Sequence, residues 1–291
     1  MDYLKNKEYI LLLRNALRED IGKGDITTML LIPKDKIVQA VLLIKEDCIV
    51  CGLGIAKAAF RLKDNKIKFK LLVKDGQCIK KGIVVAKIKG NAQAILAAER
   101  TALNSFSLLS GIATKTKKFV DMAKPYKVKI MDTRKTIPGL RGLQKYAVRI
   151  GGGYNHRFGL GEMVLIKDNH LRVTRQASGV RRLKGMIEEV KKKIPSSTKI
   201  EVEVKNLREF KEVLKGKPDI IMLDNMKVAD IKKAVAIKRS TRYSVRRTLL
   251  EASGGITLKN VRQIASTGVD MISIGALTHS LASIDISLEI L

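Results

Sequence analysis

Basic side chains suited to binding anions are concentrated in one glycine-rich stretch, residues 132–170. The stretch holds seven Lys or Arg residues. We consider four of them as candidate ligands of an anion: Arg134, Lys135, Arg157 and Lys167. Arg presents a planar fork that matches a carboxylate or a phosphate, whereas Lys supplies a compact point charge. This mixture predicts a pocket that holds several negative charges on a small ligand.

Acidic residues follow two later apolar runs and are expected among these cations. Glu201 and Glu203 alternate with valine in IEVEV, so a strand would place both on one face, and the alternation does not choose between them. Asp224 ends the next apolar run. Carboxylates at such positions hold sugar hydroxyls or Mg²⁺. The simpler alternative is that these acids only pair with nearby lysines.

Two glycine turns are candidates for a phosphate site. Ser253, Gly254 and Gly255 precede Thr257, where a helical pattern starts, and Gly275-Ala276 ends the next strand. Backbone N–H groups at the start of a helix, with no side chain in the way, bind phosphate. Glycine at one such turn usually serves backbone geometry alone, so the prediction depends on the pair.

Three histidines are present. His156 lies beside Arg157 in a glycine-flanked loop, which favours an anion donor over a purely structural imidazole. His170 is a candidate for supporting the site from behind, and His279 is predicted to be structural.

Alternating strands and helices predict the architecture of the second half of the chain. The expected strands are 127–133, 163–168, 199–205, 219–225, 247–253 and 270–275. The expected helices are 179–193, 206–215, 227–238 and 257–267. This order implies parallel pairing with right-handed crossovers, and the number of strands favours an open β/α barrel. Working residues of such barrels sit at the carboxyl ends of the strands.

The first half of the chain predicts a smaller mixed α/β domain. Residues 1–20 read as a helix, residues 25–28 open an extended region, and residues 37–90 contain several strand-like runs. Residues 91–123 have helical periodicity with a break near Ser110-Gly111, which predicts two helices. The expected domains are 1–112, with 277–291 as a candidate addition, and 113–276.

Composition limits the classes of function. Lys and Arg number 57 and Asp and Glu 28, a net charge of +29. The excess is spread along the chain, aromatic residues are only 4% and Trp is absent, so a solvated basic surface that attracts small anions is favoured over a nucleic-acid partner. Residues 236–248 are strongly basic and read as a surface insertion or a basic contact patch. Cys48 and Cys51 form a C-x-x-C inside an apolar run and are predicted to be core residues.

Membrane insertion is not predicted, because the sequence lacks a run of about 18 apolar residues. The amphipathic start lacks a cleavage signal, and we expect the protein to be cytoplasmic.

Long motifs resemble one enzyme family. DTRKT-x-PGLR, GGG-x-NHR, VLIKDNH, EVEV, LDN and LEASGGI, with EDIGKGDITT, AERTALN, SGIAT and DISLEI elsewhere, are similar to quinolinate phosphoribosyltransferase. The resemblance spans nearly the whole chain. It implies a glycosyltransferase of the pentosyltransferase class, a nicotinate-nucleotide diphosphorylase (carboxylating) acting in de novo NAD synthesis. Quinolinate and 5-phosphoribosyl 1-pyrophosphate would give nicotinate mononucleotide, pyrophosphate and CO₂.

The resemblance also implies an open β/α barrel with a mixed α/β domain, a requirement for Mg²⁺, and a homodimer or an assembly of dimers. Arg134, His156 and Arg157 would bind the two quinolinate carboxylates, and Arg100 would enter from the partner subunit. Glu203 rather than Glu201 would hold the ribose hydroxyls or Mg²⁺. The implied catalytic residues are Lys135, Lys167, Glu203 and Asp224, the last two as tentative Mg²⁺ ligands. The implied substrate-binding residues are Arg100, Thr133, Arg134, Lys135, His156, Arg157, Lys167, Glu203, Asp224, Ser253, Gly254, Gly255, Ile274, Gly275 and Ala276.

Two alternatives are weighed against this assignment. A paralogue could use another heteroaromatic acid, although the complete DTRKT and NHR elements argue against it. A binding protein could use the basic surface for nucleic acid, and strongly salt-dependent binding would be its signature.

Overall fold

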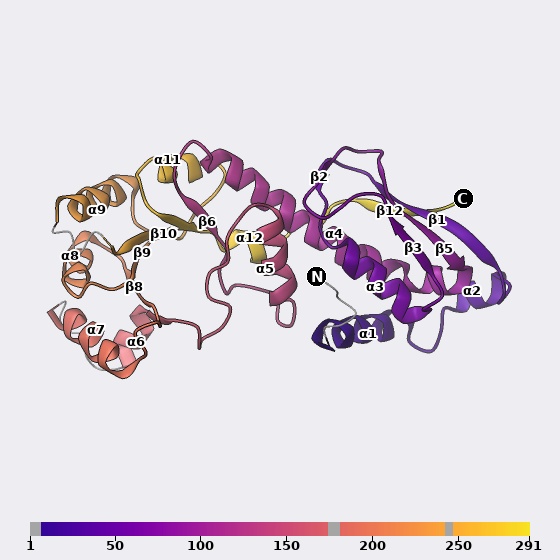
Figure 1. The fold of residues 1–291 in the computed structure, drawn as a ribbon, viewed down its shortest axis with the longest axis horizontal. Helices are drawn as coiled ribbons and strands as arrows, with labels where there is room; N and C mark the ends of the chain where they lie inside the picture. Colours follow the sequence, from indigo (N-terminus) through magenta and orange to yellow (C-terminus); the bar gives the residue numbers. More distant parts are fainter. Residues whose placement is uncertain (1–6, 174–180, 242–246) are drawn as a thin grey trace. The chain divides into compact units, whose positions relative to one another are not determined.

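Two compact units make up the chain, whose computed structural model describes residues 7–173, 181–241 and 247–291. Unit 1 comprises Met1–Lys117, Pro138–Gly152 and Leu281–Leu291, and unit 2 comprises Lys118–Ile137 and Gly153–Ser280 (Figure 1). The carboxyl-terminal strand therefore belongs to unit 1, with the amino-terminal part of the chain.

Unit 1 is built on an antiparallel sheet with the strand order β12-β1-β5-β3. Its strands are β1 (Ile37–Ile44), β3 (Lys68–Leu71), β5 (Val84–Asn91) and β12 (Ile286–Ile290), and β2 (Cys48–Ile49) pairs separately with β4 (Cys78–Ile79). Its helices are α1 (Lys7–Ile21), α2 (Ile26–Leu31), α3 (Leu53–Lys63), α5 (Arg141–Ile150) and most of α4 (Ala92–Ala123).

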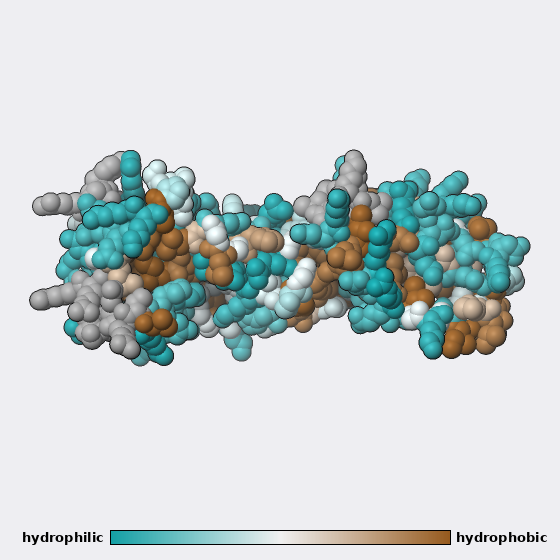
Figure 2. Space-filling view, turned by 90° about the horizontal axis from the view of Figure 1, so that it is seen from below, coloured by the Kyte–Doolittle hydropathy of each residue, from teal (hydrophilic) through white to brown (hydrophobic). Residues whose placement is uncertain are grey.

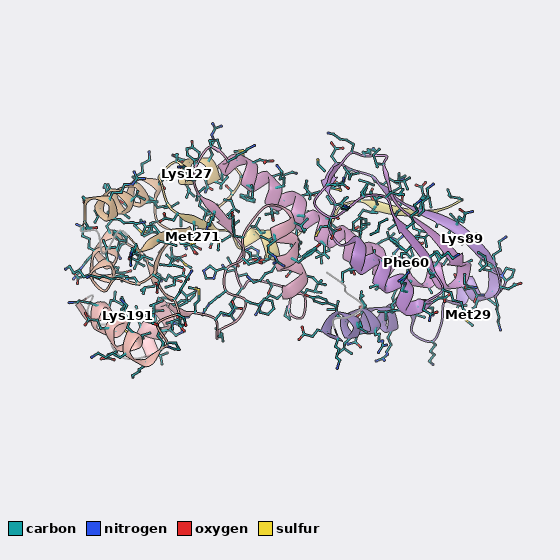
Figure 3. All side chains as sticks on the ribbon, in the orientation of Figure 1. Met29, Phe60, Lys89, Lys127, Lys191 and Met271 are labelled. Carbon is teal, nitrogen blue, oxygen red and sulfur yellow. The ribbon has the colours of Figure 1, made fainter. Side chains whose placement is uncertain are left out.

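The two faces of this sheet differ because side chains alternate along each strand. Lys68 of β3 lies directly opposite Lys89 of β5, and both are exposed. Phe69 and Ile88 are the next opposed pair and are buried. The Phe69 ring centroid lies 5.9 Å from that of Phe60 in α3. Figure 3 labels Phe60 on this helix and Lys89 on the sheet. One face therefore carries solvated lysines and the other packs on helices.

The extended region expected from Asp25 is instead the start of helix α2. The Asp25 carboxylate accepts the backbone N–H of Thr28 at 3.0 Å, which caps the helix. The sequence DITT is thus an N-cap followed by a helical turn, and the prediction of extended chain was wrong.

Helix α4 runs unbroken through 32 residues, so the prediction of two helices was wrong. Gly111 allows close packing within unit 1, because a Cβ there would overlap the carbonyl oxygen of Ala282. Ser110 is also used for packing, since its hydroxyl donates to the carbonyl of Cys51 at 3.1 Å. Both residues suggest a helix break in the sequence, but they make contacts with other segments of the same chain.

Unit 2 contains a six-stranded parallel sheet with the order β6-β11-β10-β9-β8-β7, and the predicted open β/α barrel is confirmed. Its strands are β6 (Lys129–Met131), β7 (Val164–Ile166), β8 (Ile200–Val204), β9 (Ile220–Asp224), β10 (Leu249–Ser253) and β11 (Met271–Ser273). Its helices are α6 (Asp168–Val173), α7 (Arg181–Lys193), α8 (Leu207–Lys215), α9 (Val228–Ser240), α11 (Val261–Ala265) and α12 (Ala276–His279). Helices α8 and α9 cover the outer side of β8, β9 and β10 (Figure 1).

Several local predictions from the sequence are refined. Helix α11 begins at Val261, because residues 258–260 form a turn, so the helix start expected at Thr257 was wrong. Helices α5 and α6 were not predicted. The basic segment 236–248 consists partly of the end of α9, and residues 242–246 lie outside the described residues.

Hydrophilic residues cover much of the face shown in Figure 2, with hydrophobic patches between them, and the dispersed lysine excess predicts such a largely hydrophilic surface. Within the described residues, none of the helices combines the length and apolar character needed to cross a membrane. Cys48 and Cys51 are buried free thiols, 2% and 0% exposed, which confirms that they are core residues.

Candidate active site

A cavity of about 520 Å³ opens at the carboxyl ends of the parallel strands of unit 2. It is lined by nearly all the predicted site residues: Thr133, Arg134, Lys135, His156, Arg157, Lys167, Glu203, Asp224, Ser253, Gly254, Gly255, Ile274, Gly275 and Ala276. Arg100 does not line this cavity. It lies on α4 in unit 1, where its side chain is 69% exposed and lies 3.7 Å from the carboxylate of Glu99.

Two guanidinium groups of the cavity are arranged to receive an anion. Arg134 follows strand β6, and Arg157 lies on the loop before β7. Arg157 donates from Nη1 to the carbonyl of Met163 at 3.0 Å. Burial, and then the charge of Arg134, lower the pKa of Arg157. The buried Nε atoms of both arginines lack a hydrogen-bond partner among the described residues, and both side chains line the cavity, so an anion bound there could accept hydrogen bonds from these guanidinium groups.

Lys167 and Glu203 form an ion pair across the cavity mouth. Lys167 follows strand β7, and its Nζ lies 2.9 Å from Oε2 of Glu203 near the end of β8. The lysine side chain is 43% exposed and the glutamate 9%. The pairing with lysine that we weighed as the simpler role of these acids therefore occurs at Glu203. It also places a cation and a carboxylate together where strands β7 and β8 end, so either could turn to a bound ligand.

Asp224 and the first glycine turn are held together. Asp224 ends β9 and accepts a hydrogen bond of 3.1 Å from the side-chain amide of Asn225. Asn225 in turn donates its backbone N–H to the carbonyl of Ser253 at 2.8 Å. Gly254 and Gly255 have φ values of +89° and +59°. The second turn is also packed, because a Cβ on Gly275 would lie 3.1 Å from the ring of His279.

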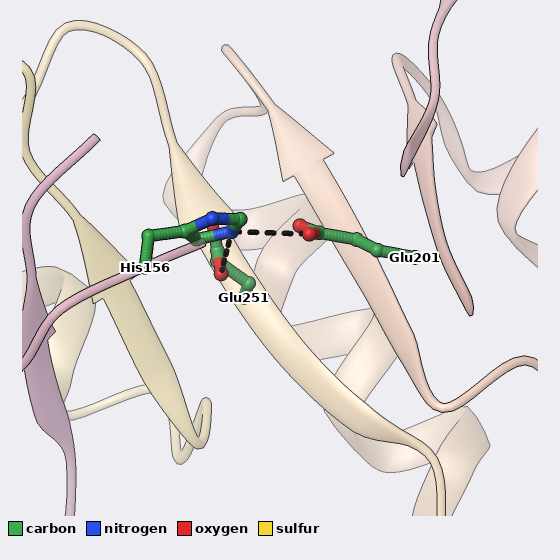
Figure 4. Close-up of side chains that lie close together, drawn as sticks. All are labelled: His156, Glu201 and Glu251. Carbon is green, nitrogen blue, oxygen red and sulfur yellow. Dashed lines mark ion pairs between the residues drawn. The ribbon is translucent and has the colours of Figure 1, made fainter. Parts of the chain in front are cut away.

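His156 directs both ring nitrogens toward protein groups. Nε2 lies 3.0 Å from Oε2 of Glu201 and 3.5 Å from Oε2 of Glu251 (Figure 4). Nδ1 accepts the backbone N–H of Arg157 at 2.9 Å. The anion-donating role predicted for His156 would therefore need the ring to turn.

The protonation of this ring follows from its neighbours. Burial favours neutral imidazole, but Glu201 and Glu251 outweigh burial and raise the pKa of His156 to about 10. Burial raises the pKa of Glu201. Because Nδ1 accepts a hydrogen bond from the Arg157 backbone, the geometry indicates a neutral ring protonated only at Nε2. The raised pKa of His156 instead favours a ring protonated at both nitrogens. A proton on Nε2, facing the two carboxylates, is common to both states.

Sequence reasoning did not assign Glu251, Ser273 or His279 to this region. Glu251 lines the cavity and is 0% exposed. Its position two residues before Ser253 in the same strand was the available signal, since alternate residues share a face. His279 was predicted to be structural but lines the cavity, as does the buried Ser273.

A cavity lined by cations, including two guanidinium groups, lies at the carboxyl ends of the strands of an open β/α barrel. This arrangement defines an enzyme site for small polyanionic substrates. Comparison with known proteins gives the particular family. The model of the quinolinate phosphoribosyl transferase C-terminal domain matches residues 112–289, and that of the N-terminal domain matches residues 25–110. The chain therefore belongs to the quinolinate phosphoribosyltransferase family.

Individual relatives match over most of their length. The chain is 44% identical to a probable nicotinate-nucleotide pyrophosphorylase (carboxylating) of Methanocaldococcus jannaschii, with 98% of each chain covered. It is 43% identical to the chloroplastic nicotinate-nucleotide pyrophosphorylase of Arabidopsis thaliana, covering 94% of this chain and 80% of that one. A solved nicotinate-nucleotide pyrophosphorylase from Francisella tularensis superposes with a TM-score of 0.88 at 41% identity, covering 98% of this chain and 96% of that one.

Proposed function

We propose that this protein transfers the phosphoribosyl group of 5-phosphoribosyl 1-pyrophosphate to quinolinate with loss of CO₂. The products are nicotinate mononucleotide and pyrophosphate, and the reaction serves NAD biosynthesis. The observation that carries the proposal is that Arg134 and Arg157 line one cavity while the Nε donor of each lacks a hydrogen-bond partner among the described residues. Family membership supplies the substrates that fit them.

The charges of the cavity suit these substrates. Quinolinate brings two carboxylates, which the two guanidinium groups can bind through charge-assisted hydrogen bonds. The pyrophosphate sugar brings further negative charge for Lys135 and Lys167. Each contact is worth about 4 kcal/mol of Coulomb attraction at 4 Å and an effective dielectric constant near 20, before desolvation costs.

The chemistry needs positioning and electrostatic field rather than a protein nucleophile. The lone pair of the pyridine nitrogen forms a bond to the anomeric carbon as the bond to pyrophosphate breaks. Positive charge develops on the ribose, and the carboxylates of Glu203 and Asp224 can stabilise it. The resulting pyridinium then accepts the electron pair of the C–C bond that breaks to release CO₂, and a proton replaces the carboxylate. Holding both substrates in line supplies much of the acceleration.

Magnesium fits the acids of this site as a partner of the substrate. Mg²⁺ is usually held by one or two carboxylates together with waters and substrate phosphates. Glu203 and Asp224 line the same cavity from the ends of the adjacent strands β8 and β9 and offer that number of carboxylates. When bound, Mg²⁺ would neutralise part of the pyrophosphate charge.

Arg100 belongs to the proposed site only in an oligomer. Its side chain is exposed on α4 and does not line the cavity of unit 2. We propose a homodimer, or an assembly of dimers, in which Arg100 of one subunit reaches the substrates of the other. Sedimentation measurements test the assembly, and mixing Arg100→Ala with Lys167→Ala protein should restore part of the activity.

The decisive experiment is turnover by the purified protein. With quinolinate, 5-phosphoribosyl 1-pyrophosphate and Mg²⁺, CO₂ and nicotinate mononucleotide should appear in equal amounts. A folded protein that releases neither product would refute the proposal. A panel of other pyridine carboxylic acids tests the paralogue alternative, which requires a better substrate than quinolinate.

A further inference from the structure

Three buried acids, Asp132, Glu201 and Glu251, contact the loop that carries Arg157. Asp132, just beyond β6, is 0% exposed and accepts the backbone N–H of His156 at 2.9 Å. Its other oxygen accepts the side-chain amide of Asn155. Glu201 is also 0% exposed and contacts the His156 ring from strand β8. The loop is thus attached to the barrel by charged groups at several points.

The His156 ring lies between carboxylates from two different strands. Glu201 comes from β8 and Glu251 from β10, and the ring nitrogen Nε2 faces both (Figure 4). The histidine side chain is only 8% exposed and both glutamates are 0% exposed. Burying two carboxylates this deeply is costly, and a well-packed apolar group in their place would often be more stable. Their presence therefore calls for a role beyond packing.

A direct connection leads from the ring to Arg157. The backbone N–H of Arg157 donates to Nδ1 of the same imidazole at 2.9 Å. The guanidinium group is held at its far end by the carbonyl of Met163 at 3.0 Å. A shift of the ring would therefore move the backbone from which Arg157 enters the cavity.

We propose that Glu201 and Glu251 are positioning residues that act through His156 to fix Arg157 for recognition of one substrate carboxylate. The inference rests on the proposed function, because it assigns the carboxylate of quinolinate to Arg157. It gives His156 a different role from direct donation to the ligand, since both of its ring nitrogens already face protein atoms.

The same three side chains could also ligate a metal ion, since their ligand atoms lie within 4.8 Å of one another. The ion-pair interpretation is favoured because Nε2 of His156 lies 3.0 Å from Oε2 of Glu201, a distance that a proton on Nε2 bridges directly. The two interpretations separate experimentally, as metal content shows.

The test is a double-mutant cycle between Glu251→Gln and Arg157→Ala. Glutamine keeps the size of the side chain and removes its charge. In otherwise wild-type protein, Glu251→Gln should raise the KM for quinolinate about tenfold or more, because small displacements of a binding group cost this much. The KM for 5-phosphoribosyl 1-pyrophosphate should stay within about twofold. In the Arg157→Ala background, Glu251→Gln should raise the KM for quinolinate by less than about twofold, because the effects of coupled residues are not additive.

Glu188→Gln is the matched control, because Glu188 is an exposed residue of α7 that pairs with Lys184. It should leave both KM values unchanged. Glu201→Gln is the second variant if Glu251→Gln does not fold, since it leaves one carboxylate for the ring.

Three results would overturn the inference. The first is an equal increase in the KM for quinolinate on Glu251→Gln in the wild-type and Arg157→Ala backgrounds. The second is an unchanged KM for quinolinate in the glutamine variants. The third is one equivalent of metal retained by wild-type protein but absent from Glu251→Gln. Turnover of quinolinate by the wild-type protein is scored separately, so failure of the proposed function is distinguishable from failure of this inference.

Discussion

Replacing Gly254 by alanine should damage both stability and binding of the sugar phosphate, whereas the same change at Gly255 should be mild. Both glycines have positive φ, +89° and +59°. A Cβ on Gly254 would lie 2.7 Å from Nδ2 of Asn225 and closer still to its Oδ1. A Cβ on Gly255 would lie 3.9 Å from the nearest atom of Asn225, an ordinary contact.

The expected magnitudes follow from these contacts. A left-handed backbone costs a residue with a Cβ about 1–2 kcal/mol, and this applies to both variants. The overlap with Asn225 adds about 1–3 kcal/mol of overpacking at Gly254 alone. We expect a loss of about 2–5 kcal/mol in the free energy of unfolding for Gly254→Ala and about 1–2 kcal/mol for Gly255→Ala.

Asn225 connects this clash to the site. Its side-chain amide donates to the carboxylate of Asp224 at 3.1 Å, so displacing that side chain disturbs the contact with Asp224, while its backbone N–H holds the carbonyl of Ser253 at 2.8 Å. Denaturant unfolding of the two variants measures the stability difference. Initial rates should show a raised KM for 5-phosphoribosyl 1-pyrophosphate in Gly254→Ala. Equal effects of the two substitutions on stability and on KM would refute the reasoning.

Three further outcomes are expected. Lys167→Ala should lower kcat/KM by about 10²-fold or more while costing about 1 kcal/mol or less of stability, because the lysine of its ion pair is half exposed; near-normal rates would contradict its assignment. Burial lowers the pKa of His156, but the neighbouring carboxylates outweigh burial and raise this pKa from 6.5 to about 10. The protonated ring therefore stabilises the folded protein fully below pH 6.5, and this stabilisation is lost as the pH rises toward 10. The difference in unfolding free energy between wild type and His156→Gln should therefore shrink over that range, and a constant difference would indicate a neutral ring. Alkylation of the folded protein should modify exposed Cys78 first, since burial raises the pKa of Cys48 to about 11 and raises that of Cys51 further; rapid loss of all thiols would contradict this.

The barrel was predictable from sequence because its strands are apolar runs that alternate with helices at regular spacing. The cavity was predictable because polar residues at the ends of parallel strands meet at one edge of a sheet. Helix α2 was missed because Asp25 as an N-cap and Asp25 as a turn residue look alike in sequence. The continuity of α4 was missed because the need for glycine at Gly111 comes from Ala282, far along the chain. Contacts of this kind leave no local pattern.

The two glutamates of β8 show why a shared face does not imply a shared role. Alternation places Glu201 and Glu203 on the same side of the strand, but a strand rises about 3.3 Å per residue, so Glu201 lies roughly 6–7 Å deeper in the barrel. Glu203, near the strand end, is 9% exposed and pairs with Lys167 at the cavity mouth. Glu201, in the layer below, is 0% exposed and faces His156. Side chains fill such barrels in layers, so depth along the strand separates a carboxylate that can meet substrate from one that can act only through a neighbour.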